Sequence, residues 1–307
     1  MTSIMKKAFS ITVVILMVLA ASFSAFAQQD TITVVHELGE VEVAKNPQTV
    51  VVFDYGLLDT VDSFGVKVAG VVKSSLPSYL EKFRADQYVD IGTLFEPNFE
   101  RIYELQPDLI LISTRQAEVF EELNRIAPTV YLTIDTSDYW GSFSSNLRLL
   151  GEIFDRSELV EAELRGIKEA MDVINAQAAE LGASALILMA NDGALSAYGP
   201  GSRFGVIHKE FGFPAADSNI EVVNHGQNVS FEYLVQVNPD LIFVIDRAAT
   251  VGGSISAQQV MDNPLVRMLN AHRNDNIYYL TSQVWYTASG GLVGTKIMVE
   301  DLEAVFQ

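Results

Sequence analysis

Cysteine is missing from the 307-residue sequence, and its absence excludes several kinds of site. Without thiols the chain cannot form a disulfide framework, a thiolate metal site or a cysteine nucleophile, and it has no sulfur for N-terminal lipid attachment. Positive charge is also scarce, because 20 Lys and Arg stand against 39 Asp and Glu, for a net charge of −19. This balance argues against binding to nucleic acids or to anionic membranes.

Only the start of the chain carries a long apolar run. Lys6 and Lys7 precede apolar residues 11–21, and the small-residue site Ala25-Phe26-Ala27 follows. This order is typical of a secretory signal peptide, whereas a membrane anchor would be longer and would end in basic residues. We expect residues 1–27 to be removed and the product to enter a confining compartment such as the periplasm, without a lipid anchor.

The remaining chain alternates short apolar runs with amphipathic stretches such as 99–105 and 117–126. At 49% hydrophobic content it can bury a large core, and its length suggests about two domains. The apolar runs are rich in β-branched residues and cover 50–53, 68–72, 109–112, 130–134, 185–189, 241–245 and 277–280. Continuous apolar strands between helices indicate mostly parallel sheets that are covered on both faces. Residues 32–35 and 41–43 flank a short turn and predict a hairpin.

A long helix is predicted in the middle of the chain. Residues 155–181 lack proline and contain one glycine, Gly166, while apolar residues keep a helical spacing. Asp155 and Glu158 can form a capping box, and Gly182 suits the C-terminal cap. About 26 residues at about 1.5 Å each would span about 39 Å. We therefore expect a first lobe over 28–150, a linking helix over 151–182 and a second lobe over 183–307.

Two segments, 98–115 and 230–247, repeat one pattern. Each reads as a capped helix, a Pro-Asp turn, a buried strand and an arginine just past the strand end. The matched positions are 132 residues apart and include Glu100 and Glu232, Pro107 and Pro239, and Arg115 and Arg247. In open α/β sheets, ligands bind beyond the carboxyl ends of strands. A strand-end arginine can simply pair with a nearby acid, but the repetition in both lobes favours a shared ligand cleft.

The order of the motifs resembles a known family. The chain is similar to the periplasmic substrate-binding proteins of iron-siderophore and vitamin B12 uptake, and within them to ferric catecholate siderophore-binding proteins. No single motif decides this, but the matching stretches run through nearly the whole chain after residue 27. They are residues 33–39, 42–47, 56–60, 92–97, 113–116, 199–205, 224–226, 246–247 and 285–286.

The resemblance implies two Rossmann-like lobes with mostly parallel sheets, joined by one long helix, with the ligand in the cleft between them. It implies a monomer without an intrinsic cofactor, which captures Fe(III) as a siderophore complex and delivers it to an inner-membrane ABC permease and its ATPase. Arg115, Arg203 and Arg247 match basic positions that face catecholate oxygens. Three guanidiniums suit this cargo, because a ferric tris-catecholate carries a formal charge of −3 and accepts planar, charge-assisted hydrogen bonds.

The resemblance implies further roles for four residues. His225 and Tyr286 match positions that complete the iron coordination when a tetradentate siderophore leaves two sites open, and imidazole and phenolate suit iron. Without the family, a loop His would be solvated and Tyr286 could be a packed aromatic. Glu100 and Glu232 match acids that dock on permease arginines, although acids in a first helical turn also stabilise the helix.

Other functions fit the sequence less well. A periplasmic hydrolase would need a nucleophile, and the sequence contains no Gly-x-Ser-x-Gly elbow, so we expect a binding protein and not an enzyme. The remaining histidines, His36, His208 and His272, show no metal-binding spacing. Haem, a corrinoid or another iron chelate stays open as cargo, because His and Tyr can both ligate haem iron.

Overall fold

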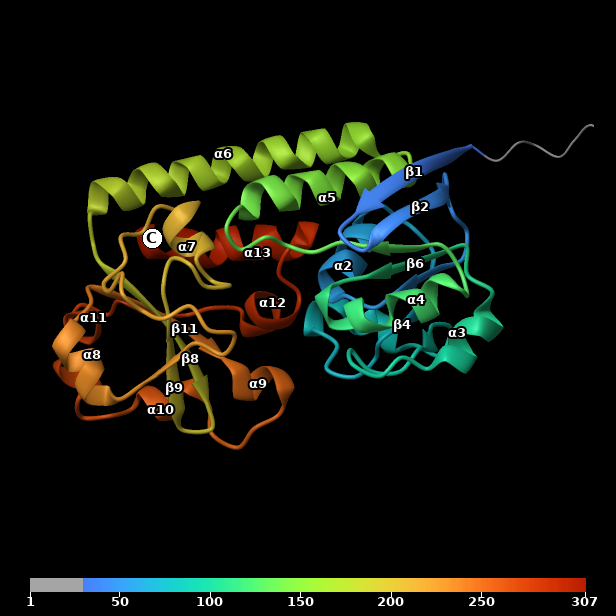
Figure 1. The fold of residues 1–307 in the computed structure, drawn as a ribbon. Coiled ribbons are helices and arrows are strands. Elements are labelled where there is room, and N and C mark those ends of the chain that lie inside the picture. Colours follow the sequence, from blue (N-terminus) through green and yellow to red (C-terminus); the bar gives the residue numbers. More distant parts are fainter. Residues whose placement is uncertain (1–29) are drawn as a thin grey trace, which may run out of the picture.

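The computed structural model describes residues 30–307, so the predicted signal peptide lies outside the described residues. Two α/β lobes lie side by side, and a layer of helices runs along both (Figure 1). Among the described helices, none is both long and apolar enough to cross a membrane. A hairpin of β1 (Thr31–His36) and β2 (Gly39–Ala44) precedes the first lobe, as predicted.

The first lobe is built on a five-stranded parallel sheet with the order β5-β4-β3-β6-β7. Its central strands are wholly buried, because helices cover both faces of their apolar runs. The strands are β3 (Val50–Val52), β4 (Val68–Val71), β5 (Val89–Asp90), β6 (Leu109–Ile112) and β7 (Thr129–Tyr131). The helices are α2 (Tyr55–Ser63), α3 (Phe99–Leu105) and α4 (Phe120–Asn124), with 3₁₀ turns at Ser78–Arg84 and Thr114–Val119.

The second lobe has a mixed five-stranded sheet with the order β10-β9-β8-β11-β12. Strands β8, β11 and β12 are parallel, whereas β9 and β10 run antiparallel at one edge. The strands are β8 (Ala185–Asn191), β9 (Ala194–Tyr198), β10 (Gln227–Val229), β11 (Leu241–Asp246) and β12 (Ile277–Tyr279). The helices are α7 (Val206–Lys209), α8 (Phe231–Val237), α9 (Arg247–Val251), α10 (Ala257–Met261), α11 (Asn270–Arg273) and α12 (Ser282–Thr287), with 3₁₀ turns at Val266–Met268 and Ala304–Phe306. The predicted α/β class with mostly parallel sheets is confirmed.

The predicted long helix exists as α6 (Ser157–Leu181), with α5 (Tyr139–Ile153) packed beside it. Its C-terminal cap is Gly182, in the left-handed conformation with φ 60°, as predicted. The predicted capping box is wrong. Asp155 itself has φ 53°, because the chain turns sharply from α5 into α6, and Arg156 takes the N-cap position instead.

The sequence repeat is also a structural repeat. Helices α3 and α8 both span seven residues and both end in a left-handed residue, Gln106 or Asn238. The aspartates that follow make matching bonds. Asp108 Oδ2 accepts from the amides of Gln48 and Thr49, at 2.9 and 2.8 Å. Asp240 Oδ2 accepts from the amide and hydroxyl of Ser184, at 3.0 and 2.8 Å. Each Asp therefore fixes the start of its strand against the neighbouring strand.

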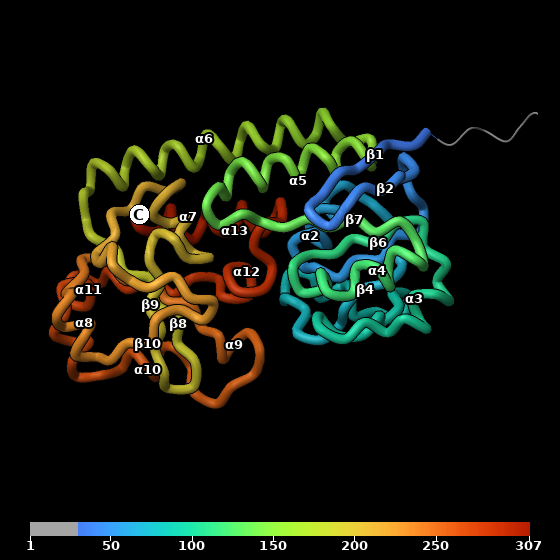
Figure 2. Tube along the Cα trace, in the orientation of Figure 1, coloured from blue at the N-terminus to red at the C-terminus, as the bar shows by residue number. Residues whose placement is uncertain are grey.

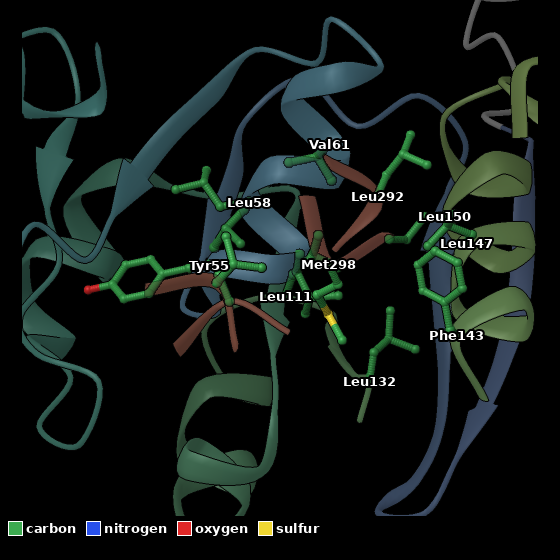
Figure 3. Close-up of a cluster of buried hydrophobic side chains, with 14 of the residues drawn as sticks. Tyr55, Leu58, Val61, Leu111, Leu132, Phe143, Leu147, Leu150, Leu292 and Met298 are labelled. Atoms are coloured by element: carbon green, nitrogen blue, oxygen red, sulfur yellow. The ribbon is translucent and has the colours of Figure 1, made fainter. Parts of the chain in front are cut away.

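The last long helix, α13 (Leu292–Glu303), returns from the second lobe and packs against α2 and α6. Figure 2 shows this path from α12 to the C-terminus below α6. Side chains from α2, α5 and α13 share one apolar cluster, with Leu58, Phe143 and Met298 among its members (Figure 3). The helix layer therefore joins the lobes through two long helices, α6 and α13.

A buried carboxylate holds the start of α13. Asp59, on α2, is 1% exposed and accepts from the amides of Val293 and Gly294, at 3.2 and 2.9 Å. The hydroxyl of Thr60 accepts from the amide of Leu292 at 3.0 Å. The approach is so close that a Cβ on Gly291 would lie 2.2 Å from Asp59 Oδ2. These contacts cap α13 from a segment more than 230 residues earlier in the chain.

Burial of Asp59 makes this joint sensitive to pH. Burial raises the pKa of Asp59 from 3.8 to about 7, although several hydrogen bonds act in the opposite direction. Between about pH 4 and pH 7 the folded chain therefore binds more protons at Asp59 than the unfolded chain does. We predict that this residue lowers the free energy of unfolding as pH rises through that window.

Asp59→Asn should remove this pH-dependent contribution. Urea unfolding at pH 4.5, 6.0 and 7.5 should show a flatter pH dependence in the variant than in the wild type. Thr60→Val is the matched control, since it removes a cap acceptor from the same joint without removing a titrating group. It should lower stability by about 0.5–2 kcal/mol at every pH. Equal slopes in wild type and Asp59→Asn would contradict the assignment.

Candidate functional site

Arg115 lies just past the carboxyl end of β6, three residues after Ile112, as the sequence predicts. It sits in a 3₁₀ turn that begins with a capping box between Ser113 and Gln116. Its Nη1 is 3.9 Å from Oδ2 of Asp54, which follows the neighbouring strand β3. Burial raises the pKa of Asp54, and the charge of Arg115 acts in the opposite direction. The pair is long, and the Arg115 side chain keeps 27% of its surface exposed.

Arg247 occupies the matching position in the second lobe, as the first residue of α9. Its partner in sequence, Asp246, is already used by backbone amides, from Ala249 at 2.9 Å and Ala257 at 2.8 Å. The guanidinium of Arg247 instead donates from Nε to the hydroxyl of Tyr286 at 2.9 Å and from Nη1 to Asn191 at 2.9 Å. In the Asp246-Arg247 pair, the acid therefore caps α9, whereas the arginine is oriented by neutral groups.

Arg203 is presented by the predicted tight turn over residues 199–205. The turn is compact, because a Cβ on Gly205 would lie 2.2 Å from the carbonyl oxygen of Pro200. Arg203 Nη2 donates to the carbonyl of Tyr286 at 2.7 Å, and its Cζ lies 5.1 Å from the ring centroid of Phe204. Burial lowers the pKa of Arg203, and the charge of Arg115 lowers it further. The charge of the first-lobe arginine therefore acts on the second-lobe arginine.

Tyr286, half-buried on α12, lies between two cations. The Cζ atoms of Arg203 and Arg247 are 5.1 and 5.6 Å from its ring centroid, so both guanidiniums contact the π system. The neighbouring Trp285 points into the core, where its Nε1 donates to Asp301 at 2.7 Å. Of this aromatic pair, Tyr286 belongs to the arginine cluster and Trp285 to the fold.

His225 is exposed and lies in the loop before β10. The next residue, Gly226, has φ 73°, and a Cβ there would lie 2.6 Å from the ring of Tyr198. Burial raises the pKa of Tyr198 to about 12, while the charges of Arg203 and Arg247 act in the opposite direction. Tyr198 therefore lies against the loop of His225, and the charges of Arg203 and Arg247 act on it. The structure groups Arg203, Arg247 and Tyr286 by direct contact, whereas His225 stands in the exposed loop before β10.

Glu100 and Glu232 are exposed in the first turns of α3 and α8. The predicted N-caps are present. Asn98 accepts from the amide of Arg101 at 3.0 Å, and Ser230 accepts from the amide of Tyr233 at 3.3 Å. Hydrogen bonds from its own amide and from the Ser230 hydroxyl lower the pKa of Glu232. Asn98 and Ser230 therefore supply the N-caps, and both glutamates remain exposed.

The sequence analysis missed two residues of the site, Asp54 and Asn191. Asp54 follows the buried strand β3, and Asn191 is the last residue of β8; these strands lie next to the strands that precede Arg115 and Arg247. The strand-end rule that identified the arginines also applies to these positions. They were overlooked because neither belongs to the repeated segments.

Comparisons with known proteins agree with this geometry. The family model described as periplasmic binding protein matches residues 50–284. The petrobactin-binding protein YclQ of Bacillus subtilis is 45% identical over 280 residues, which cover 90% of this chain and 88% of YclQ. Its crystal structure matches with a TM-score of 0.88 and covers 91% of this chain and 99% of that one.

Two relatives from Vibrio extend the match. The ferric-anguibactin-binding protein FatB of Vibrio anguillarum is 34% identical, with 90% of this chain and 88% of FatB covered. The periplasmic catecholate-siderophore binding protein VctP of Vibrio cholerae is 36% identical with a TM-score of 0.85, and the match covers 90% of this chain and all of VctP. These findings confirm the family predicted from the motifs, whose members bind ligands and are not enzymes. The chain belongs to the periplasmic binding protein family.

Proposed function

We propose that this protein binds a ferric catecholate siderophore between its lobes and delivers it to an ABC permease. The observation that carries the proposal is the arginine cluster. Arg203 and Arg247 are oriented by Tyr286, and the charge of Arg115 reaches Arg203 from the other lobe. In a chain of net charge −19, such a grouping of arginines favours an anionic partner. The petrobactin, ferric-anguibactin and catecholate binding of the relatives supports the same cargo class.

The cluster matches the chemistry of this cargo. A ferric tris-catecholate presents oxygens around a formal charge of −3, and guanidiniums donate planar, charge-assisted hydrogen bonds to such oxygens. Tyr286 and Asn191 leave N–H groups of Arg247 for a ligand, since they occupy only Nε and one bond of Nη1. Iron enters as cargo in its chelate and not as a resident cofactor.

A siderophore with four donor oxygens leaves two iron positions open. We propose that His225 and Tyr286 fill them, because imidazole nitrogen and phenolate oxygen suit iron. The loop of His225 is anchored through Gly226 against Tyr198, next to the arginines that flank Tyr286. Both residues come from the second lobe.

The predicted signal peptide and the amino-acid composition indicate the compartment in which the protein works. We propose that residues 1–27 direct export and that the product is a monomer in the periplasm. Because the sequence has no cysteine for a lipid anchor, we expect the product to diffuse freely. Its partners are an inner-membrane permease and the associated ATPase. Glu100 and Glu232, one exposed on each lobe, dock on arginines of the permease.

Replacing Arg115, Arg203 and Arg247 together by Ala should weaken binding of a ferric tris-catecholamide at least about a hundredfold. Each charge-assisted hydrogen bond contributes about 1.5–3 kcal/mol, and 1.4 kcal/mol is tenfold in affinity. Quenching of intrinsic fluorescence during titration measures the change. Arg148→Ala is the control, because Arg148 is paired with Glu161 on an exposed surface. Undiminished affinity in the triple variant would refute the charge argument.

His225→Ala combined with Tyr286→Phe should affect tetradentate and hexadentate complexes differently. With a ferric bis-catecholamide the double variant should bind more weakly and lose the phenolate contribution to the visible charge-transfer band. With a hexadentate tris-catecholamide the spectrum should stay close to that of the wild type. Phe keeps the ring between the arginines but also removes the acceptor of Arg247 Nε, so the spectrum and not the affinity alone tests iron ligation. An unchanged bis-catecholamide spectrum would rule out iron ligation.

Glu100→Ala with Glu232→Ala should abolish delivery without changing capture. Uptake of radiolabelled iron into right-side-out membrane vesicles from iron-starved cells of the source organism should fall to background. Fluorescence titration should give wild-type affinity for the ferric complex. Glu158→Ala with Glu180→Ala, two exposed positions on α6, provides the matched control. Normal uptake with the Glu100 and Glu232 variant would exclude their docking role.

A further inference from the structure

One segment of the first lobe, residues 95–103, exposes aromatic rings without an evident structural reason. Phe95, Phe99 and Tyr103 keep 72%, 36% and 64% of their surface exposed, and we call them the α3 aromatic patch. Exposed rings of this size on one short segment are unusual, because burying them would be favourable. Glu100, the proposed docking residue of this lobe, lies on α3 between Phe99 and Tyr103 in the sequence.

The backbone presents these rings in a defined way. Phe95 lies in a turn where Thr93 Oγ1 accepts from the amides of Phe95 and Glu96, at 3.2 and 2.9 Å. The turn is closed by a bridge between Gly92 and Pro97. Phe99 and Tyr103 are four residues apart on α3, so they share one helix face. The exposure therefore belongs to ordered backbone.

The structural repeat supplies an internal comparison. At a distance of 132 residues, the counterparts of the patch are Gln227, Phe231 and Val235 in the second lobe. Phe231 and Val235 pack against the second-lobe core, and the hydroxyl of Tyr233, on the same helix, donates to Asp217 at 2.8 Å. The second lobe therefore covers the face that the first lobe leaves open. The fold does not require the exposure, since the same unit is stable with this face covered.

Charge identifies the kind of partner. Glu96, Glu100 and Glu104 are all exposed around the patch, and the nearby Arg101 directs its Nη1 to the carbonyl of Asp90 at 2.8 Å. Carboxylates next to aromatic faces suit arginine, which pairs with the acid and stacks on the ring. Aromatic residues are also enriched among the residues that dominate protein–protein binding.

We propose that the α3 aromatic patch is a docking site for an arginine-bearing, partly apolar surface of the permease. The proposal rests on the proposed delivery function and extends it. The first lobe then makes a combined apolar and ionic contact through the patch and Glu100, whereas the second lobe makes an ionic contact through Glu232. Docking is therefore asymmetric, although the two lobes repeat one structural unit.

The test replaces Phe95 and Tyr103 together by Ser and measures iron transport into the membrane vesicles, with the protein loaded with a ferric bis-catecholamide. The binding-protein concentration for half-maximal transport should rise at least about tenfold, as expected for loss of two interface aromatics. Ligand affinity in fluorescence titration should stay at the wild-type value. Val173→Ser with Leu181→Ser, at positions 58% and 50% exposed on α6, should leave transport unchanged.

The outcomes separate the patch from the delivery function. If the Glu100 and Glu232 variant abolishes transport while the Phe95 and Tyr103 variant matches the wild type, the patch proposal is wrong and delivery stands. If neither variant alters transport, both proposals fail. Sedimentation velocity checks another occupant: a wild type that self-associates and a patch variant that is monomeric would assign the patch to a second copy of this chain and overturn the proposal.

Discussion

The site depends on how the fold holds positive charges together around Tyr286. Arg203 and Arg247 lie on either side of one tyrosine ring, and Arg115 adds its charge from the opposite lobe. Neutral groups, Tyr286 and Asn191, orient these cations, while the acid next in sequence to Arg247 is occupied by backbone amides. The cluster therefore keeps its charge for an anion that arrives from outside, despite a surface that is strongly acidic overall.

Duplication explains how such a cluster can be assembled. The same unit of helix, Pro-Asp turn and strand occurs once in each lobe, and Asp108 and Asp240 fix the two strands to their neighbours in the same way. Each strand then delivers an arginine at its carboxyl end. Arg203 and Tyr286 come from unrelated segments of the second lobe, so the site combines a repeated framework with additions on one side.

Much of this arrangement could be predicted from local patterns. Apolar runs revealed the central strands, and the spacing of the repeat identified Arg115 and Arg247. Both signals are local, because each depends on residues that are close together in the sequence. The start of α6 could not be predicted, since the left-handed Asp155 depends on how α5 and α6 pack. Strands β9 and β10 are short and half-exposed, which weakens their pattern. The contact between Arg247 and Asn191 joins positions 56 residues apart and leaves no local signal.

The joint between Asp59 and α13 sets a limit on how the lobes can move. Swinging them apart would separate the amides at the start of α13 from a carboxylate and a hydroxyl that no other acceptor could easily replace. The bonded start of α13 therefore favours a stiff connection between the lobes over a freely moving hinge. The cost of breaking these bonds therefore favours small adjustments of the lobes over a wide opening of the site.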